Sequence, residues 1–138
     1  MKIINRSLNP LPTYATPGSS GLDIRSNETV VIRPMQRKLI TTGLYIAIPE
    51  GFEGQLRARS GNAINHGVTL INSVGTIDGD FRQELKVPLI NLSDKPFGIG
   101  LGDRIAQLII APYEKVILEE VETLEETERK GGFGSTGR

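Results

Sequence analysis

Short apolar stretches, each closed by turn-forming residues, make up the hydrophobic pattern of this chain. The turns recur about every eight to twelve positions, a rhythm typical of a β-sandwich or β-barrel. The run from Leu85 to Asn91 alternates between apolar and polar residues and then becomes apolar on both faces. This run predicts a strand that passes from a half-exposed face into a core. Strands are predicted near residues 2–5, 28–32, 44–48, 54–57, 68–70, 84–91 and 104–112.

Other short segments predict turns and one helix. Residues 60–65 are expected to form a single helical turn with Ser60 as its N-cap, because serine accepts hydrogen bonds from free N–H groups. Asp78 and Gly79 form a pair that favours the tight turn of a β-hairpin. The glycines of residues 98–102 predict another turn between strands, and residues 14–21 predict a loop that leads into a short strand at residues 21–24.

Residues 113–130 allow two interpretations. Ile117, Val121 and Leu124 are spaced like one face of a helix, whereas residues 116–118 are rich in β-branched side chains and follow Pro112. We favour a strand through about Val121, followed by a solvated acidic stretch.

Composition limits the fold class to β structure in one domain. The length of 138 residues suits a single core. The 16 glycines and 8 prolines leave only residues 22–33 and 113–130 as long windows free of both, which excludes a helical bundle. We predict an all-β fold with one short helix, in which residues 1–128 form the domain and residues 129–138 a flexible, glycine-rich C-terminal arm.

Charge and cysteine content exclude several kinds of site. Lysine and arginine total 16, aspartate and glutamate total 16, and the formal net charge is zero, so neither nucleic acid nor a membrane is an expected partner. The absence of cysteine excludes disulfides, thiolate catalysis and cysteine-ligated zinc, and the single histidine, His66, is expected to be structural. The N-terminus lacks the apolar run of a signal peptide, so a soluble, cytoplasmic protein is expected.

Residues 75–81 place two carboxylates, Asp78 and Asp80, and the ring of Phe81 beside small residues. A plain turn accounts for this pattern. The functional alternative is that a carboxylate on a rigid turn acts as a general base towards water, while open backbone groups read the edge of a planar ligand.

Arg57, Arg59, Ser60 and Gly61 combine two guanidinium groups with a hydroxyl and a glycine at the expected start of the helix. Such a site can hold phosphate, and a charged strand end with a serine cap explains it equally well. In the strand predicted at residues 104–112, Arg104 and Gln107 are expected on opposite faces.

Residues 132–137 match the glycine spacing of a dinucleotide-binding loop, but that motif must open a helix and only Arg138 follows it. A glycine strip with two hydroxyls and a terminal arginine can instead wrap a polyphosphate. The alternative is a disordered end. Asp23 is either a turn acceptor or a supporting carboxylate.

Taken in order, residues 21–24, 59–61, 72–81, 103–107 and 131–137 resemble the trimeric deoxyuridine triphosphatase (dUTPase) family. The resemblance covers nearly the whole chain. It implies a jelly-roll-like β-barrel, a homotrimer whose active sites are shared between chains, and an arm that crosses to a neighbour. The implied reaction is hydrolysis of dUTP to dUMP and pyrophosphate, with Mg²⁺ held mainly by the triphosphate.

The resemblance also implies a role for each matching residue. Asp78 resembles the base that deprotonates the water attacking the α-phosphorus, and Asp23 resembles the carboxylate that steadies metal-bound water. The groups that recognise uracil and deoxyribose are then Asn72, Gly75, Thr76, Ile77, Phe81 and Phe133. The groups that bind phosphate are Arg59, Ser60, Gly61, Gln107, Arg129, Ser135, Thr136 and Arg138.

This sequence departs from the family at four points. Phe81 stands where tyrosine is usual, Gln83 where glycine is common and Asn62 where leucine is common, and the arm is one residue shorter after Arg129. Two alternatives to the dUTPase activity remain open from the sequence. One is a dCTP deaminase-like enzyme of the same fold, and the other is a dUTP-sensing trimeric interaction protein.

Overall fold

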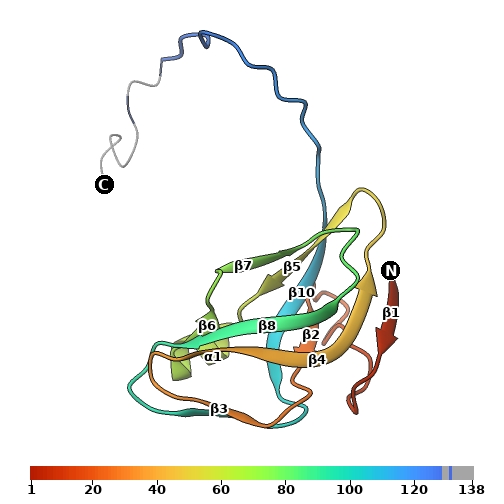
Figure 1. Cartoon of the computed structure of the whole chain (residues 1–138), viewed down its shortest axis with the longest axis vertical. Coiled ribbons are helices and arrows are strands. Elements are labelled where there is room, and N and C mark those ends of the chain that lie inside the picture. The colour runs from red at the N-terminus through yellow and green to blue at the C-terminus, as the bar shows by residue number, and fades with distance from the viewer. Residues whose placement is uncertain (129–130, 132–138) are drawn as a thin grey trace.

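The computed structural model describes residues 1–128 and 131, and its strands form three sheets. One four-stranded sheet has the order β1-β4-β8-β6, the other has the order β2-β10-β5-β7, and β3 pairs with β9 (Figure 1). The elements are β1 (Lys2–Asn5), β2 (Leu22–Arg25), β3 (Val30–Ile32), β4 (Arg37–Ala47), β5 (Phe52–Arg57), α1 (Ser60–His66), β6 (Val68–Leu70), β7 (Val74–Ile77), β8 (Glu84–Asn91), β9 (Phe97–Ile99) and β10 (Arg104–Pro112).

A single hydrophobic core joins the two larger sheets. Leu85, Val87 and Leu89 of β8 are fully buried at alternate positions, and they belong to the same cluster as Leu56 of β5 and Leu108 of β10. Burial of one face of each sheet is the main stabilising term of such a fold. The prediction of a mostly β fold with one short helix is confirmed.

The predicted strands are confirmed most closely where hydrophobic residues alternate. β1, β6, β8 and β10 have the predicted bounds. β4 begins seven residues before the predicted strand at residues 44–48, and its pairing with β8 is interrupted by a bulge between Ile40 and Leu44. Gly43 has a φ of 70° within this bulge. β9 lies where only a turn was predicted, and its partner is β3.

Two glutamates satisfy backbone groups of this bulge. Glu28 Oε1 accepts hydrogen bonds from the Thr41 N–H at 2.6 Å and from the Thr41 hydroxyl at 2.7 Å. Glu84 Oε1 accepts from the N–H groups of Thr42 at 3.2 Å and Gly43 at 2.9 Å. The carboxylates therefore replace the β-ladder partners that the bulge removes.

Replacing Glu28 by glutamine is expected to lower the free energy of unfolding at pH 7 by about 1 kcal/mol, because neutral hydrogen bonds replace charge-assisted ones. The Thr41 N–H, followed by the Thr41 hydroxyl, lowers the pKa of Glu28 below its ordinary value. A lowered folded pKa contributes stability above the unfolded pKa, and this stability is lost as the pH falls through the folded pKa.

Denaturant unfolding of wild type and Glu28→Gln should therefore give stabilities that converge as the solution is acidified, at constant protein concentration. Glu114→Gln is the matched control, since the Glu114 side chain is exposed and bonds to none of the described residues. A stability difference that is the same at every pH would contradict the prediction.

Helix α1 begins at Ser60, one residue earlier than a Ser60 cap requires. Arg59 occupies the N-cap position with an extended backbone and no side-chain cap bond, so the prediction that Ser60 is the N-cap is wrong. The helix ends at Gly67, whose φ of 64° is left-handed. The His66 ring lies 5.1 Å from the ring of Phe97, a contact that supports the structural interpretation of His66.

Residues 113–128 leave the body of the molecule after β10 (Figure 1). The predicted strand through Val121 is wrong, because no strand is formed within this segment of the described chain. Val116, Ile117 and Leu118 have exposed fractions of 77%, 99% and 89%. β-branched residues favour a strand only when a partner supplies the ladder, and among the described residues none pairs with residues 116–118. Among the described residues, no helix is long and apolar enough to span a membrane.

Candidate functional site

Three strands of one sheet bring Asp23, Gln107 and Arg57 into a row. β10 lies between β2 and β5, and Gln107 is paired with Asp23 on one side and with Arg57 on the other. Residues directly opposite each other in adjacent strands have their side chains on the same face. The structure thus brings together two predicted site residues, Asp23 and Gln107, next to the strand that leads into Arg59.

A bulge in β10 determines the face on which Arg104 lies. The register of β10 against β2 shifts between Arg104 and Ala106, and the neighbours Ile105 and Ala106 are both buried. The extra residue returns Arg104 to the face that carries Gln107, so the prediction of opposite faces is wrong. Arg104 Nη1 donates to Asp23 Oδ2 at 3.1 Å. Arg104 is therefore a site residue that sequence reasoning missed.

Asp23, Arg59 and Arg104 form a group that we call the arginine–aspartate cluster. Arg59 Nε lies 3.6 Å from Asp23 Oδ1, and both atoms are buried without a hydrogen-bond partner among the described residues. Arg59 Nη1 donates to the Arg104 carbonyl at 3.2 Å. Two guanidinium groups against one carboxylate leave an excess of positive charge, which suits a phosphate-bearing ligand. Ser60 and Gly61 are exposed immediately beside this cluster.

A second group of predicted residues lies around β7. Gly75 is buried, and a Cβ atom at this position would lie 3.2 Å from Asn72 Nδ2 and 3.3 Å from Leu56 Cβ. Glycine therefore allows the Asn72 amide to lie close against the strand. The Val74 N–H donates to the Asn72 carbonyl at 2.7 Å, and Ser73 has a φ of 62°. This compact wall, with a polar amide above it, can read the edge of a planar ring.

Asp78 follows β7 directly, at a turn in which the Phe81 N–H donates to the Asp78 carbonyl at 3.1 Å. The turn does not form a hairpin, because β7 pairs with β5 whereas β8 lies in the other large sheet. The hairpin prediction is wrong because an Asp-Gly pair sets a local turn and not the sheet that the next strand joins. The Asp78 side chain is exposed and has no partner among the described residues.

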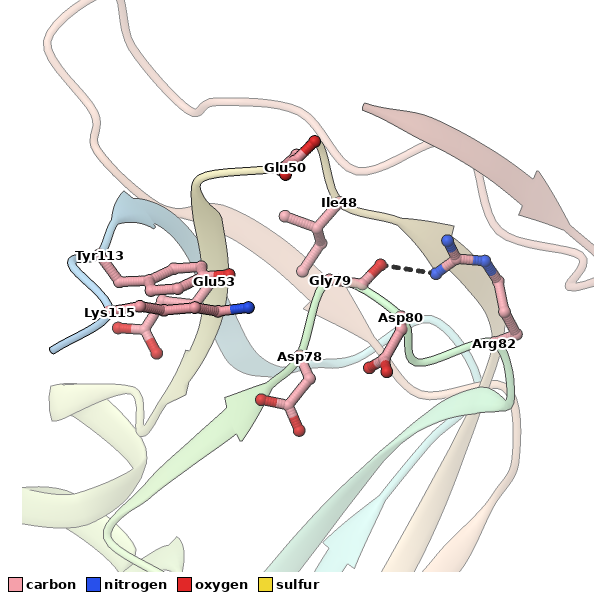
Figure 2. Close-up of a pocket in the computed structure, with 9 residues that line it drawn as sticks. All are labelled: Ile48, Glu50, Glu53, Asp78, Gly79, Asp80, Arg82, Tyr113 and Lys115. Carbon is pink, nitrogen blue, oxygen red and sulfur yellow. Dashed lines mark hydrogen bonds between the residues drawn. The ribbon is translucent and has the colours of Figure 1, made fainter. Parts of the chain in front are cut away.

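The turn after β7 opens on a cavity of about 650 Å³ (Figure 2). Beside this cavity, Lys115 Nζ lies over the Tyr113 ring, 5.8 Å from the centre of the ring. Six of the lining residues were not expected at the site, since they lie outside the recognised motifs: Ile48, Glu50, Glu53, Arg82, Tyr113 and Lys115. The full lining consists of Ile48, Glu50, Glu53, Asp78, Gly79, Asp80, Arg82, Tyr113 and Lys115.

Asp78 and the arginine–aspartate cluster lie at opposite ends of β5. The register pairs Val74 with Arg57 and Ile77 with Gly54. Asp78 is thus level with Glu53, and at about 3.3 Å per residue Arg59 lies about 20 Å farther along the strand direction. Within one chain, the distance between the phosphate-binding candidates and Asp78, the candidate base, is therefore greater than the reach of a side chain.

The donor set for a metal ion is sparse. Within residues 1–128 and 131, no group of three histidine, cysteine, aspartate or glutamate side chains could hold one. The buried Asp23 Oδ1 is an acceptor without a hydrogen-bond partner among those residues, which fits a carboxylate that binds a metal-bound water. The predicted arm residues Arg129, Phe133, Ser135, Thr136 and Arg138 lie outside the described residues.

Comparison with known proteins identifies relatives along almost the whole chain. The dUTPase family model matches residues 9–137. A deoxyuridine 5'-triphosphate nucleotidohydrolase of Finegoldia magna is 55% identical and covers 99% of this chain and 98% of its own length. The protein of the same name from Cytophaga hutchinsonii is 49% identical and covers 100% of this chain and 92% of its own length.

Solved structures show the same similarity. The dUTPase of Staphylococcus bacteriophage 80alpha, solved with dUpNHpp, aligns with a TM-score of 0.90 at 29% identity, covering 99% of this chain and 97% of the phage chain. The dUTPase of phage phi11, in which a structural Mg(II) ion is coordinated, aligns with a TM-score of 0.83 at 26% identity. That alignment covers 91% of this chain and 98% of the phage chain.

Proposed function

Since the chain belongs to the dUTPase family, we propose that it is a dUTP diphosphatase, which hydrolyses dUTP to dUMP and pyrophosphate. The observation that carries this proposal is the position of the Asp78 carboxylate, which has no partner among the described residues, at the edge of a cavity and directly after the wall formed by Asn72 and Gly75. Such an enzyme limits the incorporation of uracil into DNA and supplies dUMP for thymidylate synthesis. We propose the cytoplasm as its location.

In the proposed reaction, Asp78 orients a water molecule and accepts one of its protons. The water oxygen forms a bond to the α-phosphorus, and the bond from the α-phosphorus to the bridging oxygen of the β-phosphate breaks. Pyrophosphate leaves with that electron pair. Transfer at phosphorus depends mainly on positioning and charge neutralisation, so the chain needs to supply little more than one base and groups that bind the phosphates.

Recognition of the nucleoside is assigned to the wall around β7. Asn72 and the backbone of Gly75, Thr76 and Ile77 would bind the uracil edge, and a close fit would leave no room for the methyl group of thymine. The ring of Phe81 would pack under the deoxyribose, where a 2′-hydroxyl would clash. Phe133 of the arm would cover the base.

Recognition of the triphosphate is assigned to the residues at and around the arginine–aspartate cluster. Arg59, Ser60, Gly61 and Gln107 would bind phosphate oxygens beside the arginine–aspartate cluster, and Arg129, Ser135, Thr136 and Arg138 of the arm would close over them. Mg²⁺ bound to the triphosphate would neutralise its charge. Asp23 would hold a water of that ion through Oδ1, which supports the metal indirectly.

We propose that each site is completed by other copies of this chain in a homotrimer. The separation of about 20 Å between Asp78 and Arg59, inferred from the strand register, supports this assembly. Residues 113–128 carry exposed apolar side chains away from the body, which suits an arm that crosses to a neighbour. The arm proper, residues 129–138, would then act on a neighbour's site.

Pyrophosphate release tests the proposed function directly. With Mg²⁺ present, dUTP should be cleaved with a catalytic efficiency at least about a hundredfold above those for dTTP, UTP and dCTP. Removal of Mg²⁺ by a chelator should lower the rate with dUTP. Comparable rates with UTP would contradict discrimination at the sugar, and release of ammonia from dCTP would replace the proposal with a deaminase.

A further inference from the structure

The turn that carries Asp78 has few internal restraints. Within the described chain, residues 78–83 belong to no strand or helix. Among the described residues, the Phe81 N–H bond to the Asp78 carbonyl is the one backbone–backbone hydrogen bond within this turn. The carboxylates of Asp78 and Asp80 bond to none of the described residues. A base on such a segment needs another restraint to keep its geometry.

Arg82 supplies that restraint. Its side chain folds back over the turn, and Nη1 donates to the carbonyl oxygens of Gly79 at 2.7 Å and Phe81 at 2.8 Å. Figure 2 shows the guanidinium group reaching the Gly79 carbonyl across the edge of the cavity. One nitrogen thus ties together the residue after the proposed base and the residue that carries the proposed sugar-packing ring.

We propose that Arg82 is a positioning residue for the dUTPase reaction, which clamps the turn from Asp78 to Phe81 without contacting the substrate; this inference rests on the proposed function. Charged donors make hydrogen bonds about twice as strong as neutral ones. The two bonds therefore fix the direction of the Gly79 and Phe81 peptide groups. Arg82 sets the direction in which the Asp78 carboxylate and the Phe81 ring leave the backbone.

The side chain at position 82 must be long and charged to reach both carbonyls. A lysine nitrogen lies one bond nearer to the backbone than Nη1 does, so Arg82→Lys retains the charge but reaches the carbonyls poorly. Arg82→Ala removes both bonds. If the clamp itself is the cause, the loss of activity should therefore increase from wild type through Arg82→Lys to Arg82→Ala.

Two measurements test the clamp. Arg82→Ala should lower kcat for dUTP by about tenfold to a hundredfold while KM changes by less than about threefold, with the lysine variant between. Hydrogen exchange at the Phe81 amide should be faster in Arg82→Ala, since its bond to Asp78 is then less well held. Free guanidinium ion should restore part of the lost kcat in the alanine variant.

Arg33→Ala is the matched control, because Arg33 is exposed and its side chain bonds to none of the described residues. This variant should match wild type in both measurements. Unchanged exchange at Phe81 in Arg82→Ala would overturn the proposal whatever happens to kcat, and so would faster exchange with an unchanged kcat. Failure of the wild type to cleave dUTP would refute the proposed function, while the exchange result would still report on the clamp.

Discussion

Asp78→Asn is expected to lower kcat for dUTP hydrolysis by about two to four orders of magnitude, the usual contribution of a positioned general base. Asparagine has nearly the same shape as aspartate but cannot accept the proton of the attacking water. Asp78 is exposed and bonds to none of the described residues through its side chain, so the substitution removes no structural contact within the described chain. Pyrophosphate release measures the loss.

Binding of the analogue dUpNHpp should remain within about threefold of wild type in Asp78→Asn, since binding depends on other groups. Asp80→Asn is the matched control. Asp80 is an exposed carboxylate two residues away that lines the same cavity, and it also lacks a described partner. It should retain most of the turnover. Wild-type kcat in Asp78→Asn, or an equal loss in Asp80→Asn, would contradict the assignment of Asp78 as the base.

Alternation of hydrophobic residues made part of the fold predictable. In β8, Leu85, Val87 and Leu89 alternate without interruption, and the predicted strand at residues 84–91 has the observed bounds. In β4 the bulge at residues 41–43 breaks the alternation, so only its second half was predicted. The bulge depends on bonds to Glu28 and Glu84, which are distant in the sequence, and local patterns cannot reveal such partners.

The candidate site shows the same limit. Its residue types were predictable from the motifs, because acids, arginines and glycines at fixed spacing indicate particular chemistry. Their arrangement was not. One extra residue in β10 moves Arg104 to the face of Asp23, and the turn after Asp78 leads into a different sheet instead of a hairpin. Both features arise from the tertiary pairing of strands.

The structure of residues 113–128 could not be predicted from the sequence of one chain alone. Its β-branched residues predicted a strand, yet in the described chain their side chains extend away from the core with nothing to pair with them. β-propensity reflects packing against neighbouring strands. A second chain can supply such neighbours, so this failed prediction and the division of the site along β5 lead to the same proposed assembly.

Mixing two inactive variants should restore activity if the site is shared in this way. Arg59→Ala retains Asp78, and Asp78→Asn retains Arg59. When equal amounts are unfolded and refolded together, about a quarter of the sites should receive both intact residues, provided that the two come from different chains of a randomly mixed trimer. The expected kcat per site is then about a quarter of the wild-type value. A site contained in one chain gives no recovery.

A second mixture serves as the control. Asp78 and Phe81 lie on the same turn, so both must come from one chain. Asp78→Asn mixed with Phe81→Ala should therefore show no more activity than the sum of the two variants measured separately, although the chains exchange equally well. Recovery in the first mixture but not in the second follows only if Asp78 and Arg59 of different chains meet. Equal outcomes in the two mixtures would contradict the shared site and place the reaction within a rearranged single chain.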